Sequence, residues 1–335
     1  MFATVGPRSS ATIRCGCRCR PLWPTVRFGL RFSRMEDGNL RVAGPTPFVR
    51  SLIVTARPRQ WIKNLLVLAA PFAGGALNHP VVLRDSGTTF LSFCAVASGN
   101  YFVNDAADAE RDRHHPTKRR RPVASGDITT RLARVIGGFL LAAGIATSSL
   151  VSVRTAGIIA LYVLLTVSYS HWLKHVAVVD IVVVACGFLL RAIAGSVAAG
   201  VPVSGPFLAF ASFGALFLVV GKREGERIGL GDAAVVHRPS IAAYSAAFTA
   251  QLLSLSLTAT VLSFASWAFN TDAHTAGVPW LSLSVIPFVI AMLRATQLVL
   301  VGAGADPEEL ILRDRGTLVA TVATAAFLSI GLYVV

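Results

Sequence analysis

The chain has 335 residues, of which 54% are hydrophobic and 14% are charged. A composition this apolar excludes an ordinary soluble globular protein and predicts several membrane spans. The formal net charge of +14 calls for anionic partners, either lipid headgroups or phosphorylated ligands. Nucleic acid is rejected as a partner, because the basic residues lie in short loops between apolar runs.

The N-terminal stretch differs from the rest of the chain. Residues 1–45 are rich in Arg, Pro, Gly and Ser and lack the continuous apolar core of a secretory signal. We expect a disordered basic extension over 1–45, followed by one transmembrane domain over 46–335. Met35 is a candidate alternative start, in which case residues 1–34 are not translated.

About nine apolar stretches that are long enough to cross a bilayer follow in chain order. Small residues recur within them, as in "GGFLLAAGIATSS", which suits close helix packing in lipid. Because a span must satisfy its own backbone polar groups, the expected fold class is an all-α membrane bundle. The expected spans cover residues 61–79, 87–105, 132–150, 155–171, 179–200, 205–221, 243–269, 278–302 and 317–335.

Basic residues are distributed unevenly between the loops. The stretches "RDRHHPTKRRRP", "HWLKH", "GKREGERIGLGDAAVVHRP" and "DPEELILRDR" all follow even-numbered spans, whereas the opposite loops hold one Arg apart from "LRDS" at 83–86. The positive-inside rule therefore predicts a multi-pass plasma-membrane protein whose N-terminus and charged motifs face the cytoplasm. A single cavity entrance on the cytoplasmic side is expected to contain all of these charged motifs.

The stretch "NDAADAERD", residues 104–112, ends the second expected span. Asn104, Asp108 and Asp112 recur at helical spacing, with Asp105 on the adjoining flank. Stacked carboxylates repel each other unless a cation lies between them, and Mg²⁺ typically shares one or two carboxylates with substrate phosphates. Mn²⁺ is the alternative ion. The competing interpretation is a solvated helix end whose acids pair with neighbouring arginines.

A run of four basic residues, 118–121, follows within one loop. These side chains can act as topology determinants held against anionic lipid. Together with a metal bound by carboxylates, they also supply what is needed to hold a diphosphate and to stabilise it as it leaves. Such a site favours ionisation at the carbon that the diphosphate leaves.

The motif "NDAADAERD" resembles the N-D-x-x-D-x-x-x-D motif of the UbiA superfamily of intramembrane prenyltransferases. The resemblance implies a nine-helix bundle around a central cavity that opens to the cytoplasm. Further segments, running from about residue 50 to the C-terminus, are similar to one branch, the decaprenyl-phosphate phosphoribosyltransferases. They are "RPRQWIKN", "HPTKRRRP", "YSHWLKHVAVVDI", "GFLLRAIAG" and "GKREGER".

That branch joins phosphoribosyl diphosphate (PRPP) to a polyprenyl phosphate and releases diphosphate, in the biosynthesis of the lipid-linked arabinose donor for cell-wall arabinan. The resemblance implies that this chain is a Mg²⁺-dependent enzyme whose partners are PRPP, decaprenyl phosphate and membrane lipids. The lipid phosphate is the expected nucleophile, and departure of diphosphate yields an oxocarbenium ion. The sequence leaves open whether the protein is a monomer or a homo-oligomer.

The expected catalytic residues and metal ligands are Asp105, Asp108 and Asp112, assisted as a ligand by Asn104. The loop after the sixth span reads "GKREGERIG" without a second D-x-x-x-D, so its cations suit a phosphate better than a second metal cluster. The residues expected to bind substrate are Arg57, Lys63, Lys118, Arg121, Tyr169, Lys174, Asp180, Arg191, Lys222, Arg223 and Glu226.

Arg191 lies about three turns inside the fifth expected span, where a charge seldom faces lipid. It is expected to face the cavity and to pair with an acid or a phosphate. Two other functions compete with phosphoribosyl transfer. One is a prenyltransferase of the same fold that uses a prenyl diphosphate donor and an aromatic or other apolar acceptor. The other is a lipid-phosphate carrier without chemistry.

Overall fold

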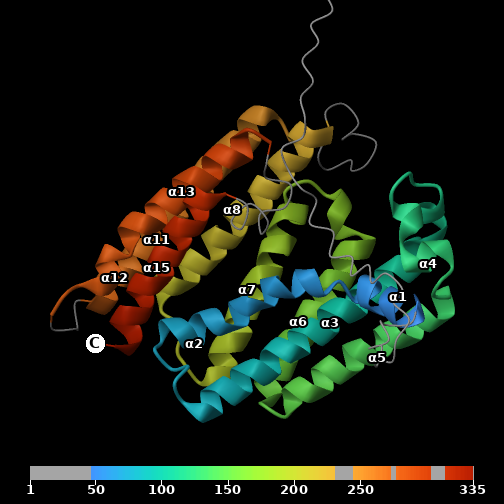
Figure 1. The fold of residues 1–335 in the computed structure, drawn as a ribbon, viewed down its shortest axis with the longest axis horizontal. Coiled ribbons are helices and arrows are strands. Elements are labelled where there is room, and N and C mark those ends of the chain that lie inside the picture. The colour runs from blue at the N-terminus through green and yellow to red at the C-terminus, as the bar shows by residue number, and fades with distance from the viewer. Residues whose placement is uncertain (1–46, 231–243, 273–276, 303–313, 335) are drawn as a thin grey trace, which may run out of the picture. The chain divides into compact units, whose positions relative to one another are not determined.

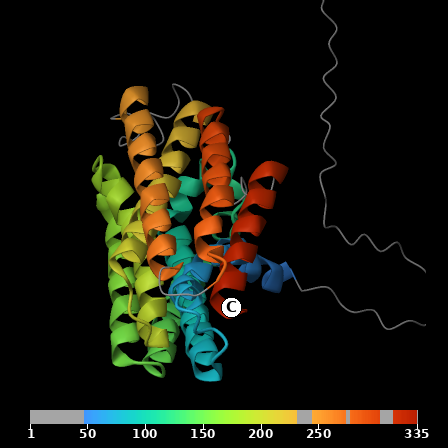
Figure 2. The same ribbon diagram turned by 90° about the vertical axis from the view of Figure 1, so that its left-hand side faces the viewer.

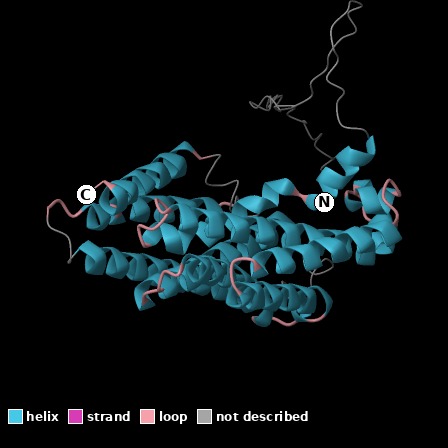
Figure 3. Cartoon of the chain, turned by 90° about the horizontal axis from the view of Figure 1, so that it is seen from below, coloured by secondary structure: helices cyan, strands magenta, loops and turns pink. Residues whose placement is uncertain are grey.

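Helices and connecting loops make up the described part of this computed structural model, which covers residues 47–230, 244–272, 277–302 and 314–334. Figure 3 shows no strand within these ranges. The all-α fold class is therefore confirmed. The predicted extension over 1–45 and the candidate start at Met35 lie outside the described residues and stay predictions.

The elements are labelled in Figure 1, where η denotes a 3₁₀ helix. In chain order they are α1 (Pro47–Ala56), η1 (Pro58–Leu68), α2 (Ala69–Ala73), α3 (Pro80–Arg113), η2 (Lys118–Arg120), α4 (Pro122–Ser125), α5 (Thr130–Ser149), α6 (Val153–His171), η3 (Leu173–His175), α7 (Val179–Ala199), α8 (Gly205–Leu230), α11 (Ala246–Asp272), α12 (Trp280–Leu283), α13 (Val285–Leu300) and α15 (Arg315–Tyr333).

Within the described ranges, seven helical segments are long and apolar enough to cross a membrane. They are α5, α6, α7, α8 up to Ile228, α11, the α12–α13 pair over Trp280–Leu300, and α15. These segments match the seven stretches predicted from residue 132 onward. The protein is thus a multi-pass membrane protein, while the count of nine spans stays a prediction.

The first predicted span, 61–79, is not one α-helix. Its residues form the second part of η1 and the five-residue helix α2, and the chain then leaves α2 at Gly74. A 3₁₀ helix of 11 residues is unusually long for this poorly hydrogen-bonded form. Contacts with other elements hold it, because Trp61 Nε1 donates to Ser98 Oγ at 3.0 Å and a Cβ built on Gly195 would lie 1.7 Å from Val67 O.

The second predicted span lies inside α3, which has 34 residues and is about 51 Å long at 1.5 Å per residue. Asp85 and Asp105 are 20 residues apart, about 30 Å along the axis, which equals the hydrocarbon thickness of a typical bilayer. Polar side chains such as Ser92 and Asn100 are buried along α3. Neighbouring helices shield these polar side chains from lipid, which allows α3 to lie in the bundle despite its low hydropathy.

Glycines bring α5 directly against α3. A Cβ built on Gly137 would lie 2.9 Å from Gly99 O and 2.7 Å from Val103 Cγ2, and one built on Gly144 would lie 2.9 Å from Ser92 O. Such close backbone approach between membrane helices requires residues without a side chain. This contact fixes α3, the helix that carries the aspartate motif, against the rest of the bundle.

Helix α7 lies between two groups of helices. It contacts η1, α3 and α6 on one side and α8 on the other. Beyond α8, helices α11, α13 and α15 pack side by side (Figures 1 and 2). An aromatic-rich core that includes Phe207, Phe264 and Trp267 fills this second group.

Two adjacent glycines of α5 give a matched test of the α3–α5 contact. Gly137→Ala is expected to destabilise the folded protein by roughly 1–3 kcal/mol, because the methyl group must displace the α3 backbone. Gly138→Ala meets no atom within 4 Å and is expected to be neutral or stabilising by up to about 1 kcal/mol. Thermal unfolding in detergent measures both. Equal melting temperatures for the two variants would contradict the close packing.

Candidate functional site

Four charged side chains from three segments meet where α3 ends. Arg57 precedes η1, Asp105 and Asp112 lie on α3, and Arg121 precedes α4. Asp105 Oδ1 lies 2.7 Å from Arg57 Nη2 and 3.3 Å from Arg121 Nη1, and Asp112 Oδ2 lies 2.8 Å from the same Arg121 nitrogen. Both carboxylates are buried, so the guanidinium groups offset the cost of removing them from water. We call these four residues the aspartate cluster.

The acids of α3 divide differently from the predicted face. Asp105 and Asp112, seven residues apart, point to one cation. Asp108 is 36% exposed and lies 3.3 Å from Arg111 Nη1, while Asn104 Nδ2 donates to Ser170 Oγ at 3.2 Å. The structure thus brings Asp105 and Asp112 together through Arg121, with Asp108 at the rim. The metal-ligand roles of the predicted set stay predictions; that set is Asn104, Asp105, Asp108 and Asp112.

Arg57 adopts a left-handed backbone conformation, with φ 53°. The residue before a proline avoids the right-handed helical region, and a left-handed non-glycine residue needs support from its surroundings. The ion pair with Asp105 and the Tyr101 ring, whose centroid lies 4.6 Å from the guanidinium carbon, supply that support. The aspartate cluster therefore fixes the point at which η1 begins.

A second set of polar side chains surrounds Arg223 on α8. Arg223 Nη1 donates to Glu226 Oε2 at 2.9 Å and Nη2 donates to Tyr169 OH at 3.1 Å. Arg223 Nε lies 3.1 Å from Asp180 Oδ2, an ion pair in which the N–H is not aligned for a hydrogen bond. Arg223 is 3% exposed and Asp180 is fully buried. With Tyr244, which donates to Asp180, these residues form the Arg223 cluster.

Helix α6 connects the two clusters through consecutive residues. Tyr169 accepts from Arg223, and Ser170 accepts from Asn104, which adjoins Asp105 in α3. One turn earlier, Asn100 Nδ2 donates to Thr166 Oγ1 at 2.8 Å. This repeated pairing of α3 amides with α6 hydroxyls sets the register of the two helices. The aspartate cluster and the Arg223 cluster thus belong to one polar end of the bundle, which we call the motif end.

The predicted lysines lie on segments of the same end. Lys63 is in η1, and Lys118 is exposed on η2, three residues before Arg121. Lys174 is half-buried in η3, and Lys222 is half-buried directly before Arg223. Each predicted phosphate-binding lysine therefore lies within six residues, along the sequence, of a member of one of the two clusters. Their substrate roles stay predictions.

Arg191 lies deeper, on α7, and within the chain its guanidinium bonds to neutral groups rather than to an acid, while its pairing with a phosphate stays a prediction. Its guanidinium donates to Asn64 Oδ1 at 2.8 Å, to Gly187 O at 2.7 Å and to Tyr162 OH at 2.8 Å. The rings of Tyr162 and Phe188 lie 4.6 and 5.7 Å from its central carbon. These neutral groups stabilise the buried cation through oriented dipoles and π faces, and they tie α7 to η1 and α6.

An apolar cavity of about 430 Å³ lies within the bundle and reaches α8 two residues before Arg223. Gly221, adjacent to Lys222 on α8, lines one part of it, and Phe210, Phe264, Trp267 and Phe288 line another. Its walls come from α7, α8, α11, α13, α15 and the η1–α2 segment. The cavity suits a hydrocarbon chain whose polar end lies beside the Arg223 cluster.

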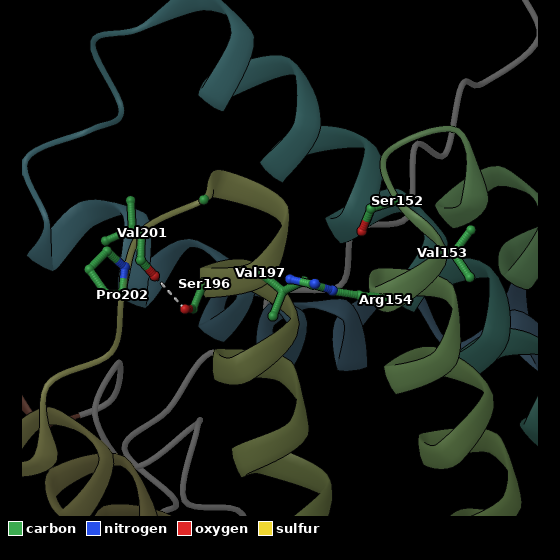
Figure 4. Close-up of a pocket in the computed structure, with 8 residues that line it drawn as sticks. Ser152, Val153, Arg154, Ser196, Val197, Val201 and Pro202 are labelled. Atoms are coloured by element: carbon green, nitrogen blue, oxygen red, sulfur yellow. Dashed lines mark hydrogen bonds between the residues drawn. The ribbon is translucent and has the colours of Figure 1, made fainter.

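A second hollow, of about 650 Å³, lies at the opposite end of the bundle, where α6 begins and α7 ends. Figure 4 shows Arg154 pointing along it towards Val197, and Ser196 donating to Val201 O. A cation beside the C-terminal end of a helix is favoured by the helix dipole. Both charged clusters lie at the other end of the bundle, so the candidate site is the motif end.

Sequence reasoning missed three hydroxyl groups of the site: Tyr162, Ser170 and Tyr244. Tyr162, Thr166 and Ser170 recur at i, i+4 and i+8 in the otherwise apolar stretch "LYVLLTVSYS", and this polar stripe indicates a face turned away from lipid. Tyr244 carries no comparable signal. It stands alone before α11, and only the fold brings it to Asp180.

Comparison with known proteins gives consistent results. A model of the UbiA prenyltransferase family matches residues 65–312. A decaprenyl-phosphate phosphoribosyltransferase of Mycolicibacterium smegmatis is 38% identical over 291 residues, covering 84% of this chain and 92% of that protein. The enzyme of the same name from Corynebacterium glutamicum is 39% identical over 287 residues, covering 84% and 86%.

Solved structures share the fold at low sequence identity. A UbiA homolog from Archaeoglobus fulgidus, bound to DMAPP and Mg²⁺, has a TM-score of 0.62 and is 17% identical, covering 84% of this chain and 99% of that one. A digeranylgeranylglyceryl phosphate synthase has a TM-score of 0.60 at 14% identity, covering 85% and 100%. Because the family model matches most of this chain, the chain belongs to the UbiA prenyltransferase family.

Proposed function

We propose that this protein transfers the 5-phosphoribosyl group of PRPP to decaprenyl phosphate and releases diphosphate, with Mg²⁺, or Mn²⁺ as the alternative, as the cofactor. The observation that carries the proposal is the joining of two charged clusters at the motif end, beside an apolar cavity. The Mycolicibacterium and Corynebacterium relatives, named for this activity and similar over most of their length, support it.

The aspartate cluster fits a divalent cation. Asp105 and Asp112 already converge on one positive group, Arg121 Nη1, and Asp108 and Asn104 add oxygen donors on the same helix end. Among the described residues no three His, Cys, Asp or Glu side chains form a ready metal centre. Mg²⁺ is usually held by one or two carboxylates together with substrate phosphates. When bound, such an ion neutralises charge that develops on a departing diphosphate.

The cations of the motif end then hold the phosphates of the two substrates. Arg57, Lys63, Lys118 and Arg121 lie on the segments around the aspartate cluster and are assigned to the diphosphate of PRPP. Lys174, Lys222 and Arg223 are assigned to the 5-phosphate and the lipid phosphate. Guanidinium groups bind such anions through bidentate hydrogen bonds. Tyr169, Asp180 and Glu226 hold Arg223 in place.

The reaction needs no general base. The bond between C1 of the ribose and the diphosphate oxygen breaks, and its electron pair leaves with the diphosphate. An oxygen of the lipid phosphate, already anionic, forms the new bond to C1, with inversion implied by the family. The part of the polyprenyl chain next to its phosphate occupies the apolar cavity, so that the phosphate reaches the motif end. Catalysis comes mainly from alignment and from stabilisation of the leaving group.

The loops predict the orientation of the site. Arg119, Arg120 and Arg121 follow α3, and further basic residues follow α6 and α8, all at the motif end. By the positive-inside rule this end faces the cytoplasm, where a water-soluble sugar phosphate is available. We propose a plasma-membrane enzyme with a cytoplasmic site, as a step towards cell-wall arabinan. The apolar cavity and the DMAPP-bound relative favour, as the second candidate, a prenyl diphosphate donor.

A labelled-substrate assay separates these functions. Membranes containing the protein are incubated with Mg²⁺, ribose-labelled PRPP and decaprenyl phosphate, and the organic layer is counted. Label is expected in that layer, and EDTA or Asp108→Asn is expected to lower the rate by roughly a hundredfold or more. The matched control is Asp127→Asn, because Asp127 is exposed in the α4–α5 loop and contacts Ser125.

A near-normal rate in folded Asp108→Asn protein would overturn the metal assignment. Absence of label with folded wild-type protein, together with transfer from a prenyl diphosphate to an aromatic acceptor, would replace the proposed function by the second candidate. Binding of PRPP without diphosphate release would indicate a carrier.

Arg121 tests the assignment of cations to the diphosphate. Arg121→Gln is expected to raise KM for PRPP by about tenfold to a hundredfold, because charged hydrogen bonds contribute about 1.5–3 kcal/mol. Arg113→Gln is the control. Arg113 pairs with the exposed Glu110 at 2.6 Å, and such surface pairs contribute little. An equal KM for PRPP in the two variants would remove Arg121 from the binding site.

A further inference from the structure

Val178 has a backbone conformation with positive φ, which is strained for a β-branched residue. Its φ is 67° and its ψ is −47°, and Val179 N–H donates to Ala177 O at 2.8 Å. This is the γ-turn of positive φ, which is rare and strained. Among the described residues Arg57 and Val178 are the non-glycine residues with positive φ. Such strain persists only where the surrounding structure enforces it, and it concentrates at functional sites.

The Val178 side chain does not explain the turn. It is 50% exposed, so packing of its methyl groups cannot offset the strain. The backbone provides the contact instead, because Val178 N–H donates to Tyr244 OH at 2.6 Å. Tyr244 is 5% exposed, and its ring stacks on Phe248 at 5.6 Å between centroids. A rigidly held phenol from the start of α11 thus holds the turn.

The same hydroxyl also reaches the Arg223 cluster. Tyr244 OH donates to Asp180 Oδ1 in a short hydrogen bond, while Asp180 Oδ2 faces Arg223 Nε. Burial, and next the hydrogen bond to Asp180, raise the pKa of Tyr244 to about 12, so the phenol retains the proton that it donates. One hydroxyl therefore accepts from the turn and orients the carboxylate that faces Arg223.

The turn is short and leads directly to predicted phosphate ligands. It joins η3, which carries Lys174, to α7, which begins one residue before Asp180. We propose that Tyr244 is a positioning residue for the reaction: through Val178 it sets the turn that joins η3, with its Lys174, to α7, and through Asp180 it sets the direction of Arg223. The proposal rests on the proposed function, in which Lys174 and Arg223 hold substrate phosphates.

A set of variants separates positioning from general stability. Tyr244→Phe removes the hydroxyl and keeps the stacked ring. It is expected to raise KM for PRPP or decaprenyl phosphate on the order of tenfold, with a smaller effect on kcat. The control is Tyr333→Phe, because Tyr333 OH donates to Phe72 O at 3.1 Å, away from the motif end.

Val178→Gly tests the turn itself. Glycine adopts positive φ without strain, so Val178→Gly in the Tyr244→Phe background is expected to restore part of the lost affinity. The hydrogen bond to Asp180 is still missing in this double variant, so recovery of the affinity should be incomplete. Val176→Gly is the matched control in the same turn region, because Val176 has φ −98°. It should restore nothing.

Hydrogen exchange gives a readout that does not depend on turnover. In the full-length protein, the peptide covering residues 173–181 is expected to exchange faster in Tyr244→Phe than in wild type. Faster exchange with unchanged KM for both substrates would overturn the positioning role and leave the proposed function intact. Unchanged exchange would overturn the proposed lock on the turn. A wild-type protein that transfers no phosphoribosyl group would instead refute the proposed function, whatever the exchange shows.

Discussion

A carboxylate buried in a membrane bundle needs a cation within reach, and this requirement organises the whole motif end. Asp105 and Asp112 share Arg121, Asp180 faces Arg223, and Glu224 pairs with Arg227 at 2.7 Å. Removing one partner of such a pair leaves an uncompensated buried charge, which costs several kcal/mol. The Arg57–Asp105 and Asp180–Arg223 pairs therefore act as fixed joints between segments that are far apart in the chain.

The joints lie on helices whose backbones are already held closely together. Gly137 and Gly144 bring α5 onto α3, and Gly195 brings α7 onto η1. These contacts leave little freedom for α3 and α7 to slide, because the limiting atoms belong to backbone. The Asn104–Ser170 and Asn100–Thr166 hydrogen bonds then fix α6 against α3. Precise placement of charged side chains is possible here because the supporting helices are rigid.

Much of this architecture is predictable from the sequence. Seven apolar stretches appear as helices, because length and hydropathy alone decide such spans. The 61–79 stretch fails as an α-helix because apolar composition does not distinguish a 3₁₀ run from an α-helix, and Ser98 and Gly195, which support the run, come from elsewhere in the chain. The sequence likewise does not show why α3 can have a low hydropathy, because it does not reveal the helices that surround this element.

Individual partners in the site were harder to predict than its place in the chain. The motif and the basic loops placed Asp105, Arg121 and Arg223 on neighbouring loops and helix ends. Helical periodicity, however, paired Asn104 with Asp108 and Asp112, whereas the structure pairs Asp105 with Asp112 through Arg121. Arg191 was expected to pair with an acid or a phosphate, and its side-chain partners within the chain are Asn64 and Tyr162. Both differences depend on rotamers and helix crossings, which periodicity does not encode.

Charge balance explains why the two clusters suit different parts of the proposed reaction. In the aspartate cluster two arginines cancel two aspartates, so a divalent ion there would add its full positive charge for a diphosphate. In the Arg223 cluster Asp180 and Glu226 outweigh one arginine, and Lys174 and Lys222 on the adjoining segments reverse that balance. A site of this second kind attracts a phosphate monoester without retaining it too firmly. Consecutive residues of α6, Tyr169 and Ser170, hold the clusters in a constant relation, so that a group bound at one is aligned with a group bound at the other.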